Sequence, residues 1–269
     1  KEVPGSYTLI LDFDFLENAY GKKFVKTIDN KIGEIVDLEP INPYKEIRYT
    51  YRYWHFMGKY NPKFDSTFVY LLPLSTEKDF KVYQMTNLNE QYFNGEKAKN
   101  WTALLFETEI GDTVFATRKG QVIKLVDEFE YDSLHIVSYK SKVNELVIEH
   151  EDGTLARYSG IKKNSFMVKL GQTVYPRTPL GVTERYDKSM KGQLCFMIYY
   201  LCDITLQKDN RETLINQIDR YGYVNPFFLT EKGTEQLKHN NNYRVKISNE
   251  IITKEFTRRE LKKITTHNH

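Results

Sequence analysis

The sequence predicts a mainly β protein, because short alternating segments, turn glycines and aromatic residues recur along most of its length. Aromatic residues make up 14% of the 269 residues, with 20 Tyr and 16 Phe, and aromatic rings pack well on a pleated, half-buried surface. We expect three parts. Residues 1–75 are predicted to form a small antiparallel β-domain, residues 76–205 a second β-sheet domain, and residues 206–269 a C-terminal extension with short helices and a strand.

Two segments near the amino end alternate between apolar and polar side chains. In residues 9–15 the large apolar residues occupy every second position, and in residues 47–53 Ile and Tyr alternate with Arg and Thr. A period of two predicts half-buried strands. A third strand is predicted over residues 67–72, because Pro73 ends the apolar run.

Short strand patterns separated by glycines fill the middle of the chain. They cover residues 113–116, 121–126, 135–139, 145–150 and 154–158, whereas the polar residues 86–100 predict a surface loop. Gly111 and Gly120 are expected at the two ends of one hairpin. Glu151, Asp152 and Gly153 are expected to form the turn between two later strands.

The C-terminal part differs in pattern. Residues 209–219 have helical spacing, and Tyr243, Val245 and Ile247 alternate as in a strand. Thr257 followed three residues later by Glu260 is a capping box, which predicts a short basic helix from there to Lys263.

Composition excludes several function classes. The net charge is only +3 and the charged residues of both signs are interspersed, so we expect no nucleic-acid partner and no polybasic membrane patch. No apolar run approaches the roughly 20 residues of a transmembrane helix. Cys195 and Cys202 are seven residues apart, so within one strand they would face opposite sides and could not pair.

Four phrases of the middle section carry a family resemblance. They are GDTVFATRKGQVIKLVD, VNELVIEHEDGTLARYSGI, VKLGQTVYPRTPLGV and GQLCFMIYYL, in this order between residues 111 and 201. Together they resemble the M23 (LytM-type) peptidoglycan endopeptidases. The preceding phrase VYLLPLSTEKDFKVYQ is similar to the approach found in envelope members from Bacteroidota-like bacteria.

The resemblance implies a zinc site in active members, and the residues that build it are missing here. Such enzymes hold zinc with a first His, an Asp and the last His of a His-x-His motif, and two further histidines assist the attacking water. The Asp position corresponds to Leu105, the His-x-His to Gln193 and Cys195, and an assisting His to Gly160. The first His corresponds to Trp101, or alternatively to Tyr92.

These departures predict a degenerate member with no catalytic residues, no bound metal and no cofactor, since Cys195 is the one side chain of the set suited to zinc. His150 is expected to be a structural residue at a strand end. Aromatic and basic residues near the former active site are the candidate groove contacts: Arg157, Tyr158, Tyr175, Arg177 and Tyr199.

The expected function is therefore binding without catalysis, in the periplasm or at the outer membrane after removal of a signal sequence. The ligand would be peptidoglycan or an envelope protein partner, with a role as a hydrolase regulator or as a subunit of an envelope complex. Two alternatives stay open. One is a zinc metallopeptidase with displaced ligands. The other is a purely structural interaction module that uses the basic final helix and the aromatic strand of residues 47–54.

Overall fold

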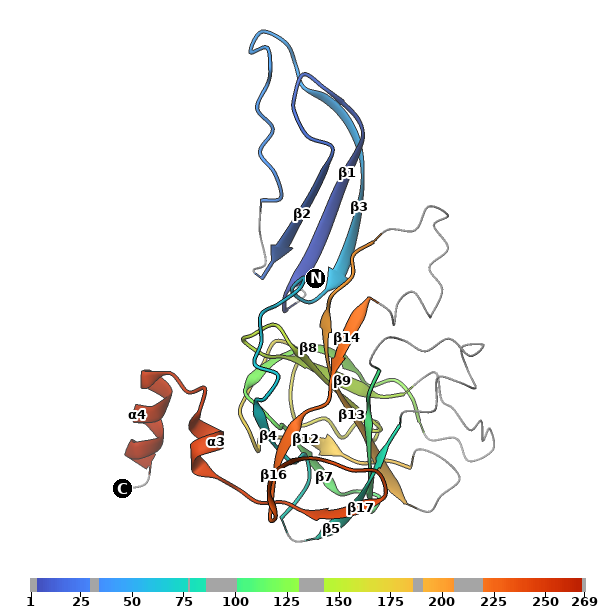
Figure 1. The fold of residues 1–269 in the computed structure, drawn as a ribbon, viewed down its shortest axis with the longest axis vertical. Helices are drawn as coiled ribbons and strands as arrows, with labels where there is room; N and C mark the ends of the chain where they lie inside the picture. The colour runs from blue at the N-terminus through green and yellow to red at the C-terminus, as the bar shows by residue number, and fades with distance from the viewer. Residues whose placement is uncertain are drawn as a thin grey trace.

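The computed structural model describes residues 4–29, 34–76, 78–85, 101–130, 143–185, 191–205 and 220–267, and the side chains of the last helix up to Lys263. Strands dominate it, with two short helices near the C-terminus (Figure 1), so the predicted mainly β fold is confirmed. The loop predicted over residues 86–100, the strand over 135–139 and the helix over 209–219 lie outside the described residues.

The amino-terminal strands form an arm that projects from the rest of the molecule (Figure 1). Its antiparallel sheet has the order β2 (Lys23–Ile28), β1 (Tyr7–Glu17), β3 (Arg48–Met57). The register pairs Leu11 with Tyr53 and Phe13 with Tyr51, so the alternating apolar residues share one face. Both strand predictions in this region are confirmed.

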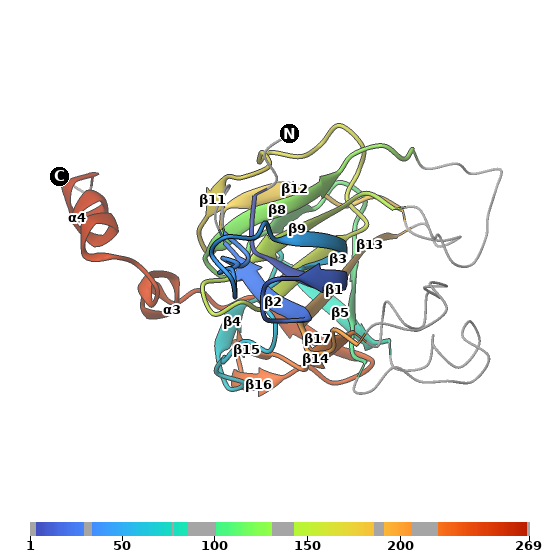
Figure 2. The same ribbon diagram turned by 90° about the horizontal axis from the view of Figure 1, so that it is seen from above.

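The larger part of the molecule is built around a nine-stranded sheet. Its main path is β11, β8, β9, β10, β13, β6, β5, β17, and β14 pairs with β13 beside that path. The bounds are β5 (Asp79–Gln84), β6 (Leu104–Thr108), β8 (Gly120–Val126), β9 (Glu145–Glu149), β10 (Leu155–Ser159), β11 (Thr173–Val174), β13 (Gly192–Leu201), β14 (Tyr221–Val224) and β17 (Asn241–Arg244). Figure 2 shows the same sheet from above.

Among the described residues, two small sheets and two helices accompany the large sheet. One sheet pairs β7 (Thr113–Phe115) with β12 (Pro179–Val182), and the other has the order β16 (Gly233–Gln236), β15 (Phe227–Thr230), β4 (Val69–Leu71). The helices are α3 (Asn249–Thr253) and α4 (Arg258–His267). Thr257 Oγ1 accepts a hydrogen bond from Glu260 N, and Thr257 N donates to Glu260 Oε2. The predicted capping box is thus confirmed.

Long-range pairing corrects three sequence assignments. The strand predicted over residues 67–72 does not join the arm, because β4 pairs in parallel with β15. The described residues of the C-terminal part contribute four strands instead of one, and β14 and β17 extend the large sheet by pairing with β13 and β5. Gly111 and Gly120 do not bound one hairpin, because β7 pairs with β12 and β8 pairs with β9 and β11.

The main core lies on one face of the large sheet. Tyr158, Phe196 and Phe228 are fully buried there, with ring centroids 5.0 Å apart for Tyr158 and Phe196 and 5.9 Å apart for Phe196 and Phe228. Because the Tyr158 hydroxyl lies 2.8 Å from Thr117 Oγ1 and accepts a hydrogen bond from Thr117 N, its polar atom is satisfied inside the core.

A buried arginine joins the turns at one end of the sheet to the C-terminal segment. The Arg118 side chain is 4% exposed, and its guanidinium forms ion pairs of 2.7 Å with Asp152 and 2.6 Å with Glu255. It also lies 3.8 Å from the ring centroid of Phe68. A buried cation without partners is strongly unfavourable, so these contacts hold the three segments in one arrangement.

We therefore expect Arg118→Ala to lower the free energy of unfolding by about 3–5 kcal/mol, because it leaves two partly buried carboxylates unpaired. The matched control is Arg52→Ala, which removes an ion pair to Asp14 whose side chains are 55% and 45% exposed, and which should cost about 1 kcal/mol or less. Denaturant unfolding measures both. Equal losses for the two variants would contradict the role assigned to Arg118.

Candidate functional site

Three neighbouring strands bring together positions that correspond to the zinc-site residues of the resembled family and that we predicted to be vestigial. Strand β13 pairs with β6 on one side and with β10 on the other, and Cys195 lies opposite Leu105 in the first pair and opposite Ser159 in the second. Directly paired residues point to the same face of an antiparallel sheet. Leu105, Ser159 and Cys195 therefore form one row, on the face opposite the main core.

The remaining vestigial positions adjoin this row. Gln193 is the next residue of β13 on the same face, where it pairs with Glu107, and Gly160 directly follows Ser159. Trp101 packs against the hydrophobic cluster that contains Cys195. The positions chosen from the sequence thus converge, with Trp101 in contact with the same cluster.

Cys195 behaves as a packed apolar side chain. It is 6% exposed, and its Sγ lies 3.8 Å from Met85 Sδ. Burial raises the pKa of the Cys195 thiol, against the opposing effect of Arg157. The nucleophile and metal-ligand form of cysteine is the thiolate, so this environment favours the unreactive neutral form.

An ion pair occupies the adjoining part of the same face. Arg157 lies opposite Met197, one step along β13 from Cys195, and it pairs with the buried carboxylate of Glu145. Lys124 donates a 2.7 Å hydrogen bond to the other oxygen of Glu145. Both oxygens of this carboxylate are therefore engaged by cations. Burial opposes ionisation of Glu145, but the attraction of Arg157 and Lys124 outweighs it and lowers the pKa.

The backbone at residue 160 has a conformation that suits glycine and not histidine. Gly160 has a φ of +95°, a region that glycine adopts readily and that strains other residues. Its carbonyl accepts a hydrogen bond of 2.9 Å from Glu184 N, which holds this conformation. A histidine at this position would have a strained backbone, whether or not it bound a metal.

These residues do not fit the zinc ion that the family resemblance implies. A zinc site needs three protein donors in a nearly tetrahedral arrangement. This row offers an aliphatic side chain at Leu105, a hydroxyl at Ser159 and a neutral buried thiol at Cys195. Glu145 lies opposite Ser159 as the next residue in register, but its two carboxylate oxygens are bound by Arg157 and Lys124. Within the described part of the chain, no three His, Cys, Asp or Glu side chains form a group that could hold a metal ion.

The predicted groove contacts separate into three environments. Arg157 and Tyr199 lie on the face of the vestigial row, where Tyr199 is 7% exposed and packs edge-on against Tyr221 at 5.1 Å. Tyr158 points into the main core and is fully buried, so its assignment to a groove is wrong. It neighbours Ser159 along β10, and successive strand residues face opposite sides.

Tyr175 and Arg177 lie beyond the sheet strands that carry the row. The Tyr175 hydroxyl donates a 2.7 Å hydrogen bond to Glu260, and the Arg177 guanidinium bonds Leu74 O and stacks 3.9 Å from the Phe115 ring centroid. Strand β11, just before Tyr175, is four strands from β13, or about 19 Å at the usual strand spacing. Neither residue reaches the vestigial row.

His150 is a structural residue at the end of β9, in the environment expected from the sequence. Its Nδ1 lies 2.8 Å from Thr154 Oγ1, and its ring lies 5.9 Å from that of Tyr70. Thr154 Oγ1 donates its proton to Asp152, so His150 Nδ1 is the donor in their contact. Burial, assisted by the Arg118 cation, lowers the pKa of His150 to about 3, so the ring is neutral near pH 7.

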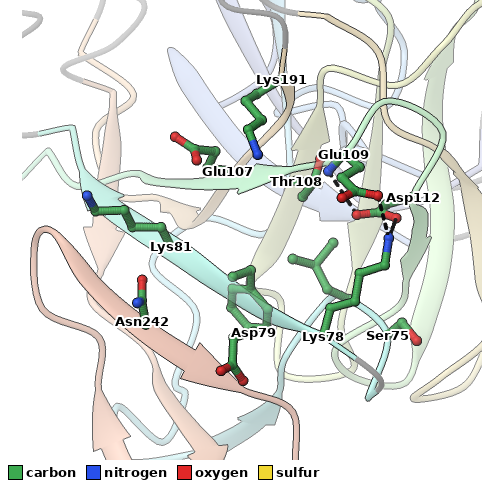
Figure 3. A pocket seen from close by; sticks show the side chains of 12 residues that line it. Ser75, Lys78, Asp79, Lys81, Glu107, Thr108, Glu109, Asp112, Lys191 and Asn242 are labelled. Atoms are coloured by element: carbon green, nitrogen blue, oxygen red, sulfur yellow. Dashed lines mark hydrogen bonds and ion pairs between the residues drawn. The ribbon is translucent and has the colours of Figure 1, made fainter.

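A charged pocket next to the vestigial row was not predicted from the sequence. Figure 3 shows this pocket, with a volume of about 240 Å³, at the ends of β5, β6 and β13. Lys81 lies opposite Glu107 in the register of β5 and β6, and Glu107 lies opposite Gln193 in the register of β6 and β13. The pocket therefore lies on the same face of the sheet as Cys195. Lys78 bonds Glu109 at 2.7 Å and Asp112 at 3.0 Å along its rim.

Part of this pocket could have been predicted from the sequence. Lys81 and Glu107 lie at exposed-face positions of alternating segments, but only the pairing of β5 with β6 shows that they are neighbours. Lys191 and Asn242 also line the pocket, and they are far apart in the sequence. Residues brought together by long-range strand pairing leave no local pattern.

No protein-family model and no curated protein matches the chain. Several solved structures share part of the fold. A zinc-containing peptidase from Vibrio cholerae has 22% identity and a TM-score of 0.31 over 50% of this chain and 36% of that one. The SpoIIQ–SpoIIIAH pore-forming complex has 16% identity and a TM-score of 0.33 over 49% and 84%.

A putative peptidase M23 from Pseudomonas aeruginosa has 12% identity and a TM-score of 0.33 over 74% of this chain and 89% of that one. The description of this last neighbour names the family that the four sequence phrases resemble. The chain spans less than half the length of the Vibrio peptidase (36%) and of lysostaphin (42%). At these TM-scores the overlap is partial, and the chemistry of the site follows from this chain's own side chains.

No helix among the described residues is long and apolar enough to cross a membrane. This finding concerns the described helices alone.

The environment of Cys195 predicts slow thiol chemistry. In the native protein, a thiol reagent at pH 8 should modify Cys195 at least about 100-fold more slowly than in the denatured protein, because the reaction needs an accessible thiolate. The measurement uses a Cys202→Ala variant so that a single thiol is counted. Rapid native modification would contradict the packed, neutral state and would revive a reactive role for Cys195.

The ion pair beside Cys195 predicts a dependence of stability on pH. Glu145→Gln should lower the free energy of unfolding by about 2–4 kcal/mol near pH 7, since Arg157 loses its partner and is two-thirds buried. Because the folded-state pKa of Glu145 is lowered from the ordinary value of 4.5, its stabilisation is present above pH 4.5 and is lost as the pH falls below it.

The difference in unfolding free energy between the wild type and Glu145→Gln should therefore shrink below pH 4.5. Glu130→Gln is the control, because Glu130 pairs with Lys163 but is 76% exposed, and it should change stability by about 0.5 kcal/mol or less. A difference that stays constant with pH would argue against an ionised Glu145 in the folded state.

Proposed function

We propose that this chain is a catalytically inactive, M23-like protein of the bacterial cell envelope that acts by binding. The observation that carries the proposal is the row formed by Leu105, Ser159 and Cys195, with Arg157 beside it. An active zinc peptidase needs an ion that activates a water molecule. This row supplies no set of donors for such an ion and places a cation where the ion would be repelled.

The charged pocket is the binding region that we propose. Its lining combines basic side chains, among them Lys81 and Lys191, with acidic ones, among them Glu107 and Asp79. A ligand that carries both carboxylate and ammonium groups would find partners of each sign within one small cavity. The stem peptides of peptidoglycan have this mixed charge, and so does an extended segment of a partner protein.

Two biological roles are compatible with binding at this position. The protein could recruit or activate a cell-wall hydrolase while bound to peptidoglycan, or it could serve as a subunit of an envelope complex. The support for both is the family resemblance of the four sequence phrases, which is an argument by analogy and not from the chemistry of the site. The proposed location, periplasmic or associated with the outer membrane, rests on the same resemblance.

The alternative activity is that of a zinc metallopeptidase with displaced ligands. It would need histidines from other parts of the sequence, and His135 lies outside the described residues. The described residues provide Glu145 as an acidic group near the row, but Arg157 and Lys124 already occupy its oxygens. The occupied state of this carboxylate favours the binding role over the enzymatic one.

Metal analysis and a hydrolysis assay on the purified chain decide between these two functions. We expect well below one zinc ion per chain after purification in the presence of zinc, and no release of fragments from purified peptidoglycan. An active M23 peptidase assayed in parallel verifies the substrate. Stoichiometric zinc that a chelator removes, together with cleavage that the chelator abolishes, would establish the displaced-ligand enzyme.

Sedimentation with purified peptidoglycan sacculi tests the binding role of the pocket. If the pocket binds stem peptides, Lys81→Gln should weaken retention about 10-fold, because one charge-assisted contact is lost. The control is Lys169→Gln, an exposed lysine outside the pocket, which should retain wild-type binding. No retention of the wild type would exclude peptidoglycan as the ligand and leave a protein partner.

A further inference from the structure

The C-terminal segment separates its acidic side chains from its basic ones. Glu255 and Glu260 both turn toward the sheet body, where Glu255 pairs with Arg118 at 2.6 Å and Glu260 pairs with Lys119 at 2.8 Å. Their side chains are 16% and 22% exposed. These ion pairs neutralise the acidic residues that the sequence places among the basic ones.

Two basic side chains of the same segment lie away from this acidic side. Arg258, Arg259, Lys262 and Lys263 are all exposed. In α4, Arg258 and Lys262 are four residues apart and so share one face of the helix. Glu260 lies two residues from each, which at 100° per residue places it on the opposite face, whereas Lys263, three residues after Glu260, lies on the side of Glu260. The outward surface of α4 that carries Arg258 and Lys262 is therefore basic.

The position of α4 makes this surface accessible. Figures 1 and 2 show the helix standing away from the sheets at one side of the molecule. The capping box and the contacts of Glu260 with Lys119 and Tyr175 hold its first turn. An exposed convex helix of this kind presents an open surface, so it suits a broad, flat anionic surface.

We infer that the outward face of α4, with Arg258 and Arg259 at its start, binds an anionic phospholipid surface. Its recognition chemistry is the attraction between several guanidinium and ammonium groups and lipid phosphates, with exposed Leu261 at the edge of the basic face. The choice of a lipid surface rests on the proposed envelope location. This site is separate from the charged pocket and uses none of the pocket's residues.

The test is co-sedimentation of the full chain with lipid vesicles at low salt. Vesicles in which phosphatidylglycerol makes up a third of the lipid should retain the protein, whereas pure phosphatidylcholine vesicles should not, and high salt should release it. The double variant R258Q/R259Q should bind the anionic vesicles about 25-fold more weakly, at roughly fivefold for each charge near the surface.

The matched control is K22Q/K26Q, which removes the same charge from two exposed lysines on the amino-terminal arm and should bind like the wild type. Thermal unfolding of both variants verifies that they fold. The inference is overturned if the wild type does not prefer anionic vesicles, if both variants lose binding equally, or if the chain binds an acidic polypeptide but no vesicles. None of these outcomes depends on zinc content or on retention by sacculi, so the proposed function is tested separately.

Discussion

The pairing of β13 with β6 on one side and β10 on the other determines which side chains meet on each face of the large sheet. Odd-numbered residues of β13 form the vestigial row and its neighbours, and even-numbered residues such as Phe196 enter the main core. A shift of one residue would exchange the two faces. The burial of Phe196 against Tyr158 and Phe228 therefore holds Cys195 beside Leu105. The position of Cys195 thus depends on the core and not on the side chains of the row itself.

Under the proposed function, this constraint explains how a site could lose its chemistry while its geometry persists. The core on the opposite face sets the register, so the positions of residues 105, 159 and 195 depend little on which side chains they carry. Leu105 adds apolar contacts on that face, and Cys195 packs against Met85. This packing and the ion pair of Arg157 with Glu145 stabilise that face.

Local patterns predicted most of what is local. The alternation in residues 9–15 and 47–53 identified β1 and β3, and Thr257 with Glu260 identified the start of α4. The sequence could not show that β4 pairs in parallel with β15, because the two strands are more than a hundred residues apart. Tyr158 illustrates the same limit within a single strand. Its neighbour Ser159 belongs to the vestigial row, on the opposite face of the sheet. Only the structure shows that Tyr158, and not Ser159, points into the main core.

Charge gives the sharpest example of information that appears only in three dimensions. Counted along the chain, residues 254–263 carry five basic and two acidic side chains, which predicts a basic helix but does not show which of its faces is basic. Folding removes Glu255 and Glu260 from that count, because Arg118 and Lys119 neutralise them near the sheet. Arg118 is nearly inaccessible and needs anionic partners to be stable there. Arg118 thus holds Glu255 toward the sheet, and Lys119 with Tyr175 holds Glu260 there, which leaves basic side chains on the outer surface.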